Sequence, residues 1–177
     1  MNSSYRLSET HTRRGFLRGT LAASLPLAFP TLLRSAPVPP SEKLHLAVIG
    51  AGSRGGDHTR AWTGVPESRM VAVCDVNRKS AERIKAAADS AQGNNSCAVY
   101  SDFRELLERD DIDAVSIAVP DHWHAIIALQ AIRAGKHVYL EKPVAYTVEQ
   151  GRALVNAVRK YGVVLQNGTQ QRSMSTF

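Results

Sequence analysis

Short hydrophobic runs alternate with amphipathic stretches along the chain from Leu44 onward. The runs expected to form strands are Leu44–Ile49, Met70–Val76, Cys97–Tyr100, Ala114–Val119, His137–Leu140 and Val163–Gln166. The helices expected between them are Arg54–Val65, Lys79–Gln92, Asp102–Glu108, His122–Ala134 and a last one that runs from Thr147 to Tyr161. The runs are almost continuously apolar, which is typical of strands buried on both faces of a parallel sheet.

This order of elements predicts an α/β fold with one doubly wound, Rossmann-type parallel sheet of six strands. Right-handed crossovers favour the strand order 3-2-1-4-5-6. Turn and cap signals support the helix boundaries. Thr147 and Gln150 have the spacing of a capping box, Gly135 and Gly162 stand where helix C-terminal glycines belong, and Ser101 is expected to cap the short helix after it.

The N-terminal segment resembles a twin-arginine export signal. Thr12–Leu17 contains the paired Arg13 and Arg14, and a mildly apolar stretch over residues 19–33 follows. That stretch has 15 residues and two prolines, so it is too short and too broken for a stable membrane span. We expect a signal peptide over residues 1–36 that directs the chain through the twin-arginine export machinery to the periplasm. A disordered basic tail and an organelle transit peptide are the alternatives.

Charge and composition add little beyond this division. Prolines mark residues 37–43 as a linker, and the sheet follows over residues 44–167. Residues 1–36 hold five of the 22 basic residues and one of the 16 acidic residues, so most of the net charge of +6 lies there. The nearly balanced remainder has no electrostatic footprint for nucleic acid.

The two cysteines are expected to be free thiols. Cys74 and Cys97 are too few for a disulfide framework or a tetrahedral metal site, and no metal site is expected. In the predicted sheet, Cys74 lies near the end of the second strand and Cys97 at the start of its parallel neighbour. The two thiols should therefore lie at opposite ends of the sheet.

A G-x-G-x-x-G motif directly follows the first strand and opens the first helix. In that position Gly50 permits a tight turn, Gly52 lets the backbone approach a pyrophosphate, and Gly55 lets the helix pack closely on the strand. The start of the helix offers unpaired N–H groups and a partial positive charge to a diphosphate. Ser53 and Arg54 lie in the same loop and are candidates for further contacts. The pattern predicts a dinucleotide site.

Asp75 ends the second strand, 20 residues after Gly55. A carboxylate at this place can accept hydrogen bonds from the adenosine ribose hydroxyls, and it repels a 2′-phosphate. This favours NAD over NADP. Arg78 and Lys79 follow closely and leave NADP open, because a cation there can accept the phosphate. The alternative for Asp75 is a turn or helix-cap residue.

Further candidates follow the fourth and fifth strands, whose carboxyl ends face the nicotinamide half of such a site. Val119, Pro120 and His124 come after the fourth strand. After the fifth, Lys142 can hydrogen-bond a substrate hydroxyl and stabilise developing oxygen charge during hydride transfer, while Glu141 can orient that lysine or touch the nicotinamide ribose. The alternatives are a surface Lys–Glu pair and an Asp-capped helix whose histidine and tryptophan pack on the sheet.

Four segments together resemble the Gfo/Idh/MocA oxidoreductases, the family of glucose–fructose oxidoreductase and inositol dehydrogenase. They are the glycine loop, Pro120–His124, Ala134–Val138 and Glu141–Pro143. The resemblance covers about residues 44–177. The export leader is similar to those of exported bacterial members. A Glu-Lys-Pro motif at the end of the fifth strand is the most specific of these signals.

The resemblance implies roles for single residues. Lys142 matches the family lysine that contacts the reacting hydroxyl of the substrate, and Glu141 matches the residue near the nicotinamide ribose. His124 matches the histidine beside the cofactor at the start of the helix after the fourth strand, and Asp75 matches the ribose-binding acid. The implied cofactor is NAD, and the implied substrate is a sugar or polyol.

The resemblance also implies a second domain. In the family, a largely antiparallel α+β domain supplies most of the substrate pocket, the acid–base residue and the oligomer interface. Residues 168–177 resemble the segment that leads into that domain. We expect this chain to be a fragment, a truncated reading frame or a protein that needs a partner chain, with low activity alone. A homo-oligomer of the full-length form stays open.

Two other functions compete with the dehydrogenase. The first is an exported glycosidase of related architecture, which keeps NAD bound and uses transient oxidation to enable elimination. The second is a non-catalytic nucleotide-binding module. Regeneration of bound NAD at each turnover, with release of free sugar, would favour the glycosidase.

Overall fold

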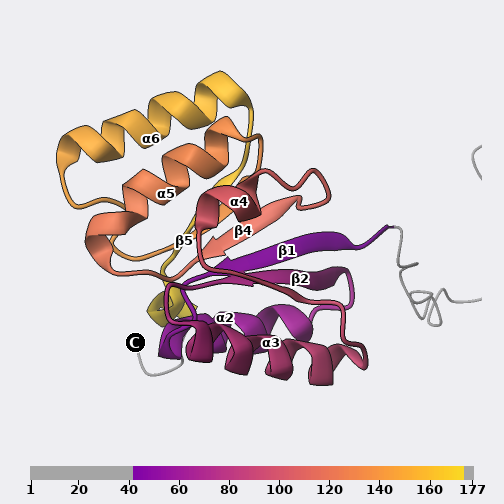
Figure 1. Ribbon diagram of the computed structural model, residues 1–177. Helices are drawn as coiled ribbons and strands as arrows, with labels where there is room; N and C mark the ends of the chain where they lie inside the picture. The colour runs from indigo at the N-terminus through magenta and orange to yellow at the C-terminus, as the bar shows by residue number, and fades with distance from the viewer. Residues whose placement is uncertain (1–41, 174–177) are drawn as a thin grey trace, which may run out of the picture. The chain divides into compact units, whose positions relative to one another are not determined.

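The computed structural model of the 177-residue chain describes residues 42–173. The predicted signal peptide over residues 1–36, most of the linker and residues 174–177 lie outside the described part. Within it, six strands form one parallel sheet in the order β3-β2-β1-β4-β5-β6 (Figure 1). The strands are β1 (Leu44–Ile49), β2 (Ser68–Cys74), β3 (Ala98–Tyr100), β4 (Ala114–Ile117), β5 (His137–Glu141) and β6 (Leu165–Gly168). The predicted fold class and strand order are confirmed.

The helices cover both faces of the sheet. They are α2 (Ser53–Thr63), α3 (Arg78–Gln92), α4 (Phe103–Leu107), α5 (Asp121–Arg133), α6 (Val148–Tyr161) and a short 3₁₀ turn, η2 (Gln170–Ser173). Figure 1 shows α2 and α3 on one face and α4, α5 and α6 on the other. This is the doubly wound arrangement, which results because right-handed crossovers run outward from β1 in opposite directions.

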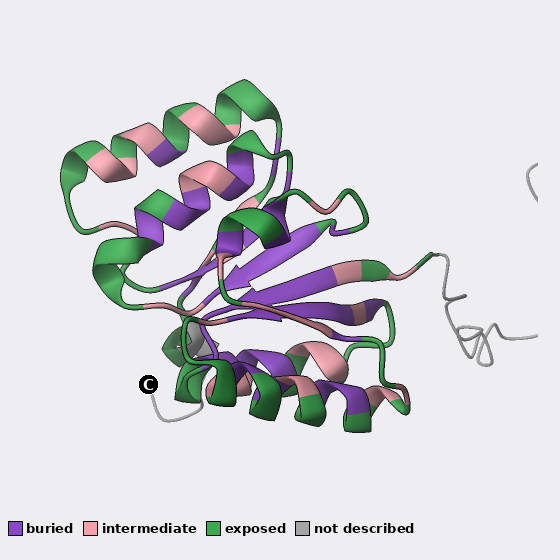
Figure 2. Ribbon diagram, in the orientation of Figure 1, coloured by how far each residue is buried: buried purple, intermediate pink, exposed green. Residues whose placement is uncertain are grey.

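Burial on both faces explains the continuous apolar runs. Val48, Val73, Val115 and Ile117 in the central strands are fully buried, and Figure 2 shows the same strands lying between the two helix layers. Side chains of successive residues point to opposite faces of a strand, so a strand covered on both faces needs apolar residues at every position.

Only the first strand has its predicted bounds. The second was expected over Met70–Val76, but β2 spans Ser68–Cys74, and β3 and β5 each differ from the prediction by one residue. The fourth apolar run was expected to reach Val119, but β4 ends at Ile117, because the chain turns toward α5, which begins right after Pro120. The sixth strand was expected over Val163–Gln166, but β6 spans Leu165–Gly168. Its register is set by backbone bonding to β5, which extends the ladder into polar residues.

The helix caps follow the prediction in all but one case. Thr147 and Gln150 form the capping box of α6, and Gly135 and Gly162 have φ of 75° and 67°. The expectation for Ser101 is wrong. Asp102 caps α4 instead, because its carboxylate accepts the backbone N–H of Arg104 at 2.8 Å. A charged acceptor one residue further along fits the first turn of that helix better.

Both cysteines are free, as predicted, and both are buried. In the register of β2 and β3, Cys74 lies opposite Tyr100, whereas Cys97 precedes the other end of β3. Burial is the main cause that raises the pKa of Cys74 to about 12 and that of Cys97 to about 11. Neither thiol is a nucleophile at neutral pH, because the thiolate is the reactive form.

Lys136 is buried within the segment that carries part of the family resemblance. Only 7% of it is exposed, and its Nζ donates to the backbone carbonyl of Arg109, just beyond the end of α4, at 2.6 Å. We expect Lys136→Ala to lower the free energy of unfolding by about 2 kcal/mol, because it removes a charge-assisted hydrogen bond and leaves that carbonyl unpaired. Urea unfolding measures the loss.

The matched control for this change is Lys79→Ala, which removes an exposed lysine near the start of α3. Its expected effect is within about 0.5 kcal/mol of zero. Equal stability of the two variants would show that the buried lysine contributes no more than a surface one.

Candidate dinucleotide site

The glycine loop between β1 and α2 has the geometry that two of its glycines require. Gly50 has φ of 99°, and a Cβ there would lie 2.4 Å from the carbonyl oxygen of Ala118. A Cβ at Gly55 would lie 1.9 Å from the carbonyl oxygen of Gly50. Both positions therefore exclude any side chain, and they bring the start of α2 against the end of β1.

Gly52 has a different environment. A Cβ built there meets no described protein atom within 4 Å, so no packing contact in this part of the chain requires the glycine. Gly52 caps α2 without a side-chain hydrogen bond, and Ser53 and Arg54 begin the helix. The first N–H groups of a helix have no intrahelical partner, and an anion placed beside this glycine would meet them. The loop therefore forms a cradle for a diphosphate.

Asp75 ties the end of β2 to the glycine loop. One carboxylate oxygen accepts the backbone N–H of Ala51 at 2.6 Å, and the other accepts that of Asn77 at 2.7 Å. Each oxygen keeps a further lone pair for a ligand hydroxyl. The helix cap of α3 is Asn77 rather than Asp75. The carboxylate thus has a structural role in addition to the predicted contact with ribose.

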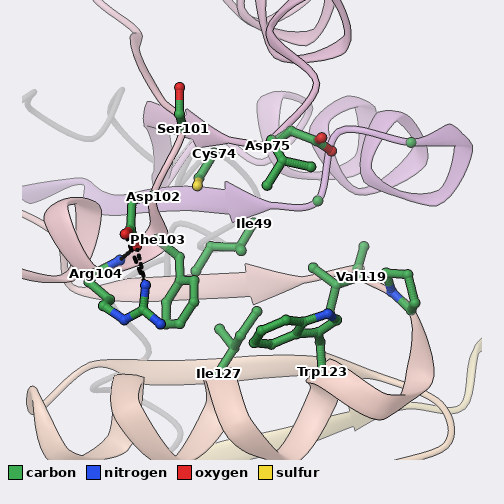
Figure 3. A pocket seen from close by; sticks show the side chains of 15 residues that line it. Ile49, Cys74, Asp75, Ser101, Asp102, Phe103, Arg104, Val119, Trp123 and Ile127 are labelled. Atoms are coloured by element: carbon green, nitrogen blue, oxygen red, sulfur yellow. Dashed lines mark hydrogen bonds and ion pairs between the residues drawn. The ribbon is translucent and has the colours of Figure 1, made fainter.

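A pocket of about 520 Å³ opens beside this loop (Figure 3). Its lining includes the predicted residues Gly50, Gly52, Asp75, Val119 and Pro120. Figure 3 shows Trp123 and Ile127 on α5 and Phe103 on α4 as its apolar walls. An apolar cleft with a few polar groups at one end suits a planar base with its attached ribose.

His124 lies under the strand ends and is fully buried, with 1% exposed. Its Nδ1 lies 2.6 Å from the carbonyl oxygen of Pro143, and its Nε2 lies 2.9 Å from that of Val119. The imidazole therefore joins the loops that follow β5 and β4. Both ring nitrogens contact carbonyls of the chain itself. The predicted position of His124 beside the cofactor therefore stays a prediction.

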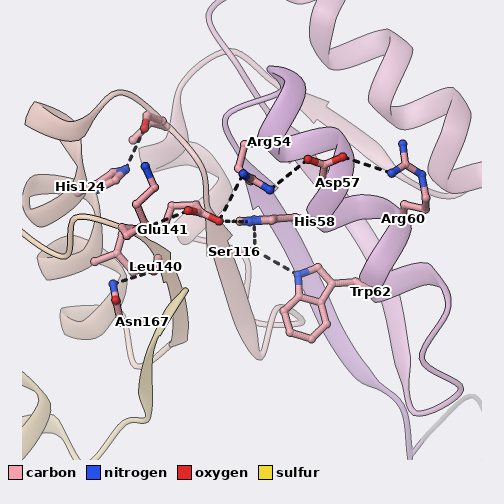
Figure 4. Close-up of polar contacts among 12 residues, drawn as sticks. Arg54, Asp57, His58, Arg60, Trp62, Ser116, His124, Leu140, Glu141 and Asn167 are labelled. Carbon is pink, nitrogen blue, oxygen red and sulfur yellow. Dashed lines mark hydrogen bonds and ion pairs between the residues drawn. The ribbon is translucent and has the colours of Figure 1, made fainter. Parts of the chain in front are cut away.

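Glu141 and Lys142 occupy different environments at the end of β5. Lys142 is exposed, and the peptide bond to Pro143 is cis. Glu141 is 5% exposed, and its carboxylate is directed toward α2 (Figure 4). It accepts the backbone N–H of Lys142 at 3.2 Å. The structure thus leaves the lysine exposed and buries the glutamate that precedes it. Contact of Glu141 with the nicotinamide ribose stays a prediction.

A buried polar network around Glu141 was missing from the sequence-based prediction. His58 on α2 binds the Glu141 carboxylate at 2.9 Å, and its other ring nitrogen contacts the Ser116 hydroxyl at 2.9 Å. Trp62 donates to the same hydroxyl at 3.1 Å. Two signals point to this network: a serine inside an otherwise apolar strand, and a histidine on α2 one turn after Gly55.

Tyr139 on β5 borders the same network. Its ring makes edge contacts with those of His58 and Trp62, with centroids 5.2 and 5.5 Å away. Burial raises the pKa of the Tyr139 hydroxyl, and the negative charge of Glu141 adds to this. The hydroxyl therefore stays protonated near neutral pH.

Residues 42–173 contain neither a candidate metal cluster nor a candidate membrane-spanning helix. No group of three or more His, Cys, Asp or Glu side chains in that range could hold a metal ion. No helix in the same range is long and apolar enough to cross a membrane.

A family model described as "Oxidoreductase family, NAD-binding Rossmann fold" (Gfo/Idh/MocA) matches residues 44–169. An uncharacterized oxidoreductase YrbE of Bacillus subtilis (strain 168) is 36% identical over 132 residues, 75% of this chain and 37% of that protein. A glycosyl hydrolase family 109 protein of Saccharopolyspora erythraea is 37% identical over 133 residues, 71% of this chain and 29% of that protein. The chain thus spans about a third of the length of these relatives.

Solved structures agree with the same fold. A putative myo-inositol dehydrogenase from Sinorhizobium meliloti 1021 superposes with a TM-score of 0.67 and 32% identity, over 73% of this chain and 37% of that one. GenD2 from gentamicin A biosynthesis, in complex with NAD, superposes with a TM-score of 0.64 and 31% identity, over 72% of this chain and 34% of that one. Both likenesses lie in the part of the chain that carries the glycine loop.

Proposed function

Because the chain belongs to the Gfo/Idh/MocA oxidoreductases and carries their NAD-binding Rossmann domain, we propose that it is the cofactor-holding half of a sugar or polyol dehydrogenase. The reaction is hydride transfer between a secondary alcohol and nicotinamide. The observation that carries the proposal is the placement of three features on one sheet edge: the glycine loop, the Asp75 carboxylate and the exposed Lys142.

The residues present fit a dinucleotide along the carboxyl edge of the sheet. The open space at Gly52 and the start of α2 suit the diphosphate, and Asp75 suits the adenosine ribose. The pocket between α4 and α5 suits adenine. When bound, the nicotinamide ring accepts or donates the hydride. The chain's own part is to bind and orient the ring beyond β4 and β5.

Lys142 is the residue best placed to act on a substrate. It is exposed directly after β5, next to the buried Glu141 in the chain. An ammonium group near the reacting hydroxyl stabilises the negative charge that develops on oxygen as hydride leaves carbon. The inositol dehydrogenase structure similar to this chain supports a polyol as substrate.

Deuterium transfer tests the proposal without requiring fast turnover. The 177-residue chain is incubated with NAD⁺ and a panel of sugars and polyols deuterated at their secondary carbons, and the nicotinamide is analysed by mass spectrometry. We expect deuterium on the ring with at least one polyol. Lys142→Met should lower the transfer about 100-fold, as loss of an oxyanion donor typically does.

The matched control is Lys160→Met. Lys160 lies in the last turn of α6, which leads to the amino end of β6 and not to the carboxyl ends of the strands. This variant should transfer deuterium at the wild-type rate. A chain that binds NADH but transfers no deuterium from any alcohol of the panel would contradict the dehydrogenase. That result would support the non-catalytic module.

A glycosidase is the second candidate, because a relative 37% identical to this chain is a glycosyl hydrolase family 109 protein. A glycosidase with bound NAD⁺ would oxidise a ring hydroxyl to a ketone, eliminate the leaving group, add water to the unsaturated sugar and return the hydride from NADH, so that NAD⁺ is regenerated. Incubation with aryl glycosides separates the two. Release of free sugar with no net gain of NADH supports the glycosidase, whereas NADH that accumulates with the oxidised alcohol supports the dehydrogenase.

The N-terminal segment supports a further proposal about localisation, namely export through the twin-arginine route. The signal over residues 1–36 carries Arg13 and Arg14 before its apolar stretch. Changing both arginines to lysine keeps the charge but removes the arginine pair that the export machinery recognises. We expect the wild-type chain in the periplasmic fraction and the double variant in the cytoplasmic fraction. Equal export of both would contradict the proposal.

A further inference from the structure

A line of buried polar groups lies beneath the carboxyl ends of β4 and β5, against α2 (Figure 4). Trp62 Nε1 donates to Ser116 Oγ at 3.1 Å, Ser116 Oγ lies 2.9 Å from His58 Nδ1, and His58 Nε2 lies 2.9 Å from Glu141 Oε1. His58 is 7% exposed and Ser116 is fully buried. The proposed hydride transfer assigns no role to Trp62, Ser116 or His58.

With a neutral His58, one assignment of protons gives every contact along the line a donor and an acceptor. Ser116 Oγ accepts the indole N–H of Trp62, and its own proton is then directed at His58 Nδ1. A neutral imidazole that accepts at Nδ1 carries its proton on Nε2. His58 therefore donates to the Glu141 carboxylate, and its tautomer is set from the opposite side by Ser116.

The Glu141 carboxylate has further donors nearby. The backbone N–H of Lys142 donates at 3.2 Å, and Nε of Arg54 lies 3.6 Å from Oε1. A buried carboxylate stays ionised only where such groups compensate for lost water. Gly168 on β6 leaves room for it, because a Cβ there would lie 3.3 Å from Oε1. His58 is the nearest side-chain donor in this set.

The negative charge of the Glu141 carboxylate affects the cofactor through its position. Glu141 directly precedes Lys142, at the edge of the sheet where the nicotinamide half of a dinucleotide binds. Oxidised nicotinamide carries a positive charge, whereas reduced nicotinamide is neutral. A carboxylate held under the ring site attracts only the oxidised form electrostatically.

We infer that His58 is a positioning residue that holds the Glu141 carboxylate in place, and that the pair makes the site favour NAD⁺ relative to NADH. The inference rests on the proposed function, since it requires the nicotinamide ring at this edge. It adds a specific role to a histidine on the helix that follows the glycine loop. His58 acts on the cofactor only through the charge of Glu141.

Two substitutions of His58 separate positioning from packing. In His58→Gln the amide reaches about as far as Nε2 and can still donate to Glu141. In His58→Asn the amide reaches about as far as Nδ1, so it can contact Ser116 but not the carboxylate. The two variants lose the same ring and its contacts with Tyr139. They differ mainly in the bond to Glu141.

The experiment measures the dissociation constants of NAD⁺ and NADH for the 177-residue chain and three variants, together with their thermal unfolding. We expect Glu141→Gln to raise the ratio Kd(NAD⁺)/Kd(NADH) roughly tenfold, the effect of one unit charge about 10 Å away at an effective dielectric of about 20. His58→Asn should raise the ratio in the same direction by a smaller factor above about twofold, because it leaves the charge but no longer holds the carboxylate in place. His58→Gln should stay within about twofold of the wild-type ratio, since it keeps the donor.

Two results would overturn the inference while leaving the proposed function intact. One is an unchanged ratio in Glu141→Gln with both cofactor forms still bound, which would remove the role of the charge. The other is a pair of His58 variants that lower both affinities alike and give equal ratios, which would make His58 a packing residue. A folded wild-type chain that binds neither form would overturn the proposed function as well.

Discussion

Gly55→Ala is expected to destabilise the fold by about 3 kcal/mol or more, a large loss for a single added methyl group. The new Cβ would lie 1.9 Å from the carbonyl oxygen of Gly50. Gly50 has no room to move away, because a Cβ built there already falls 2.4 Å from Ala118. Urea unfolding followed by circular dichroism measures the loss.

Gly52→Val in the same loop separates folding from binding. No described protein atom lies within 4 Å of a Cβ at Gly52, so we expect a loss of stability of only about 1 kcal/mol, which valine causes as a poorer N-cap of α2. The side chain would occupy the space proposed for the diphosphate, so NADH binding should be lost. If Gly55→Ala were as stable as the wild type, or Gly52→Val bound NADH normally, the proposed role of the loop would be wrong.

Asp75→Asn is expected to weaken NADH binding and to reduce the preference for NADH over NADPH. The carboxylate accepts the N–H groups of Ala51 and Asn77 with its two oxygens, and an amide can replace only one of these acceptors. The ribose of NADH would also lose its hydrogen bond to a charged acceptor. Such a loss costs about 2 kcal/mol, so NADH affinity should fall about 30-fold. NADPH affinity should fall less, because the charge that repels its 2′-phosphate is also lost.

The control for this prediction is Asp121→Asn. Asp121 is exposed in the first turn of α5, at the same edge of the sheet, and it makes no described bond to the glycine loop. The variant removes the same charge, so a similar fall in NADH affinity would assign the effect to net charge rather than to the bonds of Asp75. Titration of each variant with NADH and NADPH distinguishes these outcomes.

Most of the fold could be predicted from the sequence, because both the strands and the connections leave local signals. Strands such as β4 are buried on two faces and read as continuous apolar runs, and Gly135 and Gly162 mark helix ends through their positive φ. The strand order then follows from the handedness of the crossovers. The errors lie at boundaries, as in β6, where backbone pairing with β5 decides the strand's extent.

The candidate site could be predicted only in part. The glycine loop and Asp75 lie in a short segment with fixed spacing, so their neighbourhood can be read along the chain. His58 and Glu141 are 83 residues apart, and His58 and Ser116 are 58 apart. Their contact depends on how α2 lies across β4 and β5, which no local pattern records. For His124 the sequence left packing on the sheet as an alternative, but it did not identify the two loop carbonyls that the ring contacts.

Calorimetric titration of the purified 177-residue chain with NADH and NADPH tests the central claim most directly. The account predicts saturable binding of NADH, weaker binding of NADPH, and loss of NADH binding in Gly52→Val, which keeps the wild-type fold. A wild-type chain with the native circular dichroism spectrum that binds neither nucleotide would contradict it, since a complete glycine loop with Asp75 in place would then be insufficient to hold the cofactor.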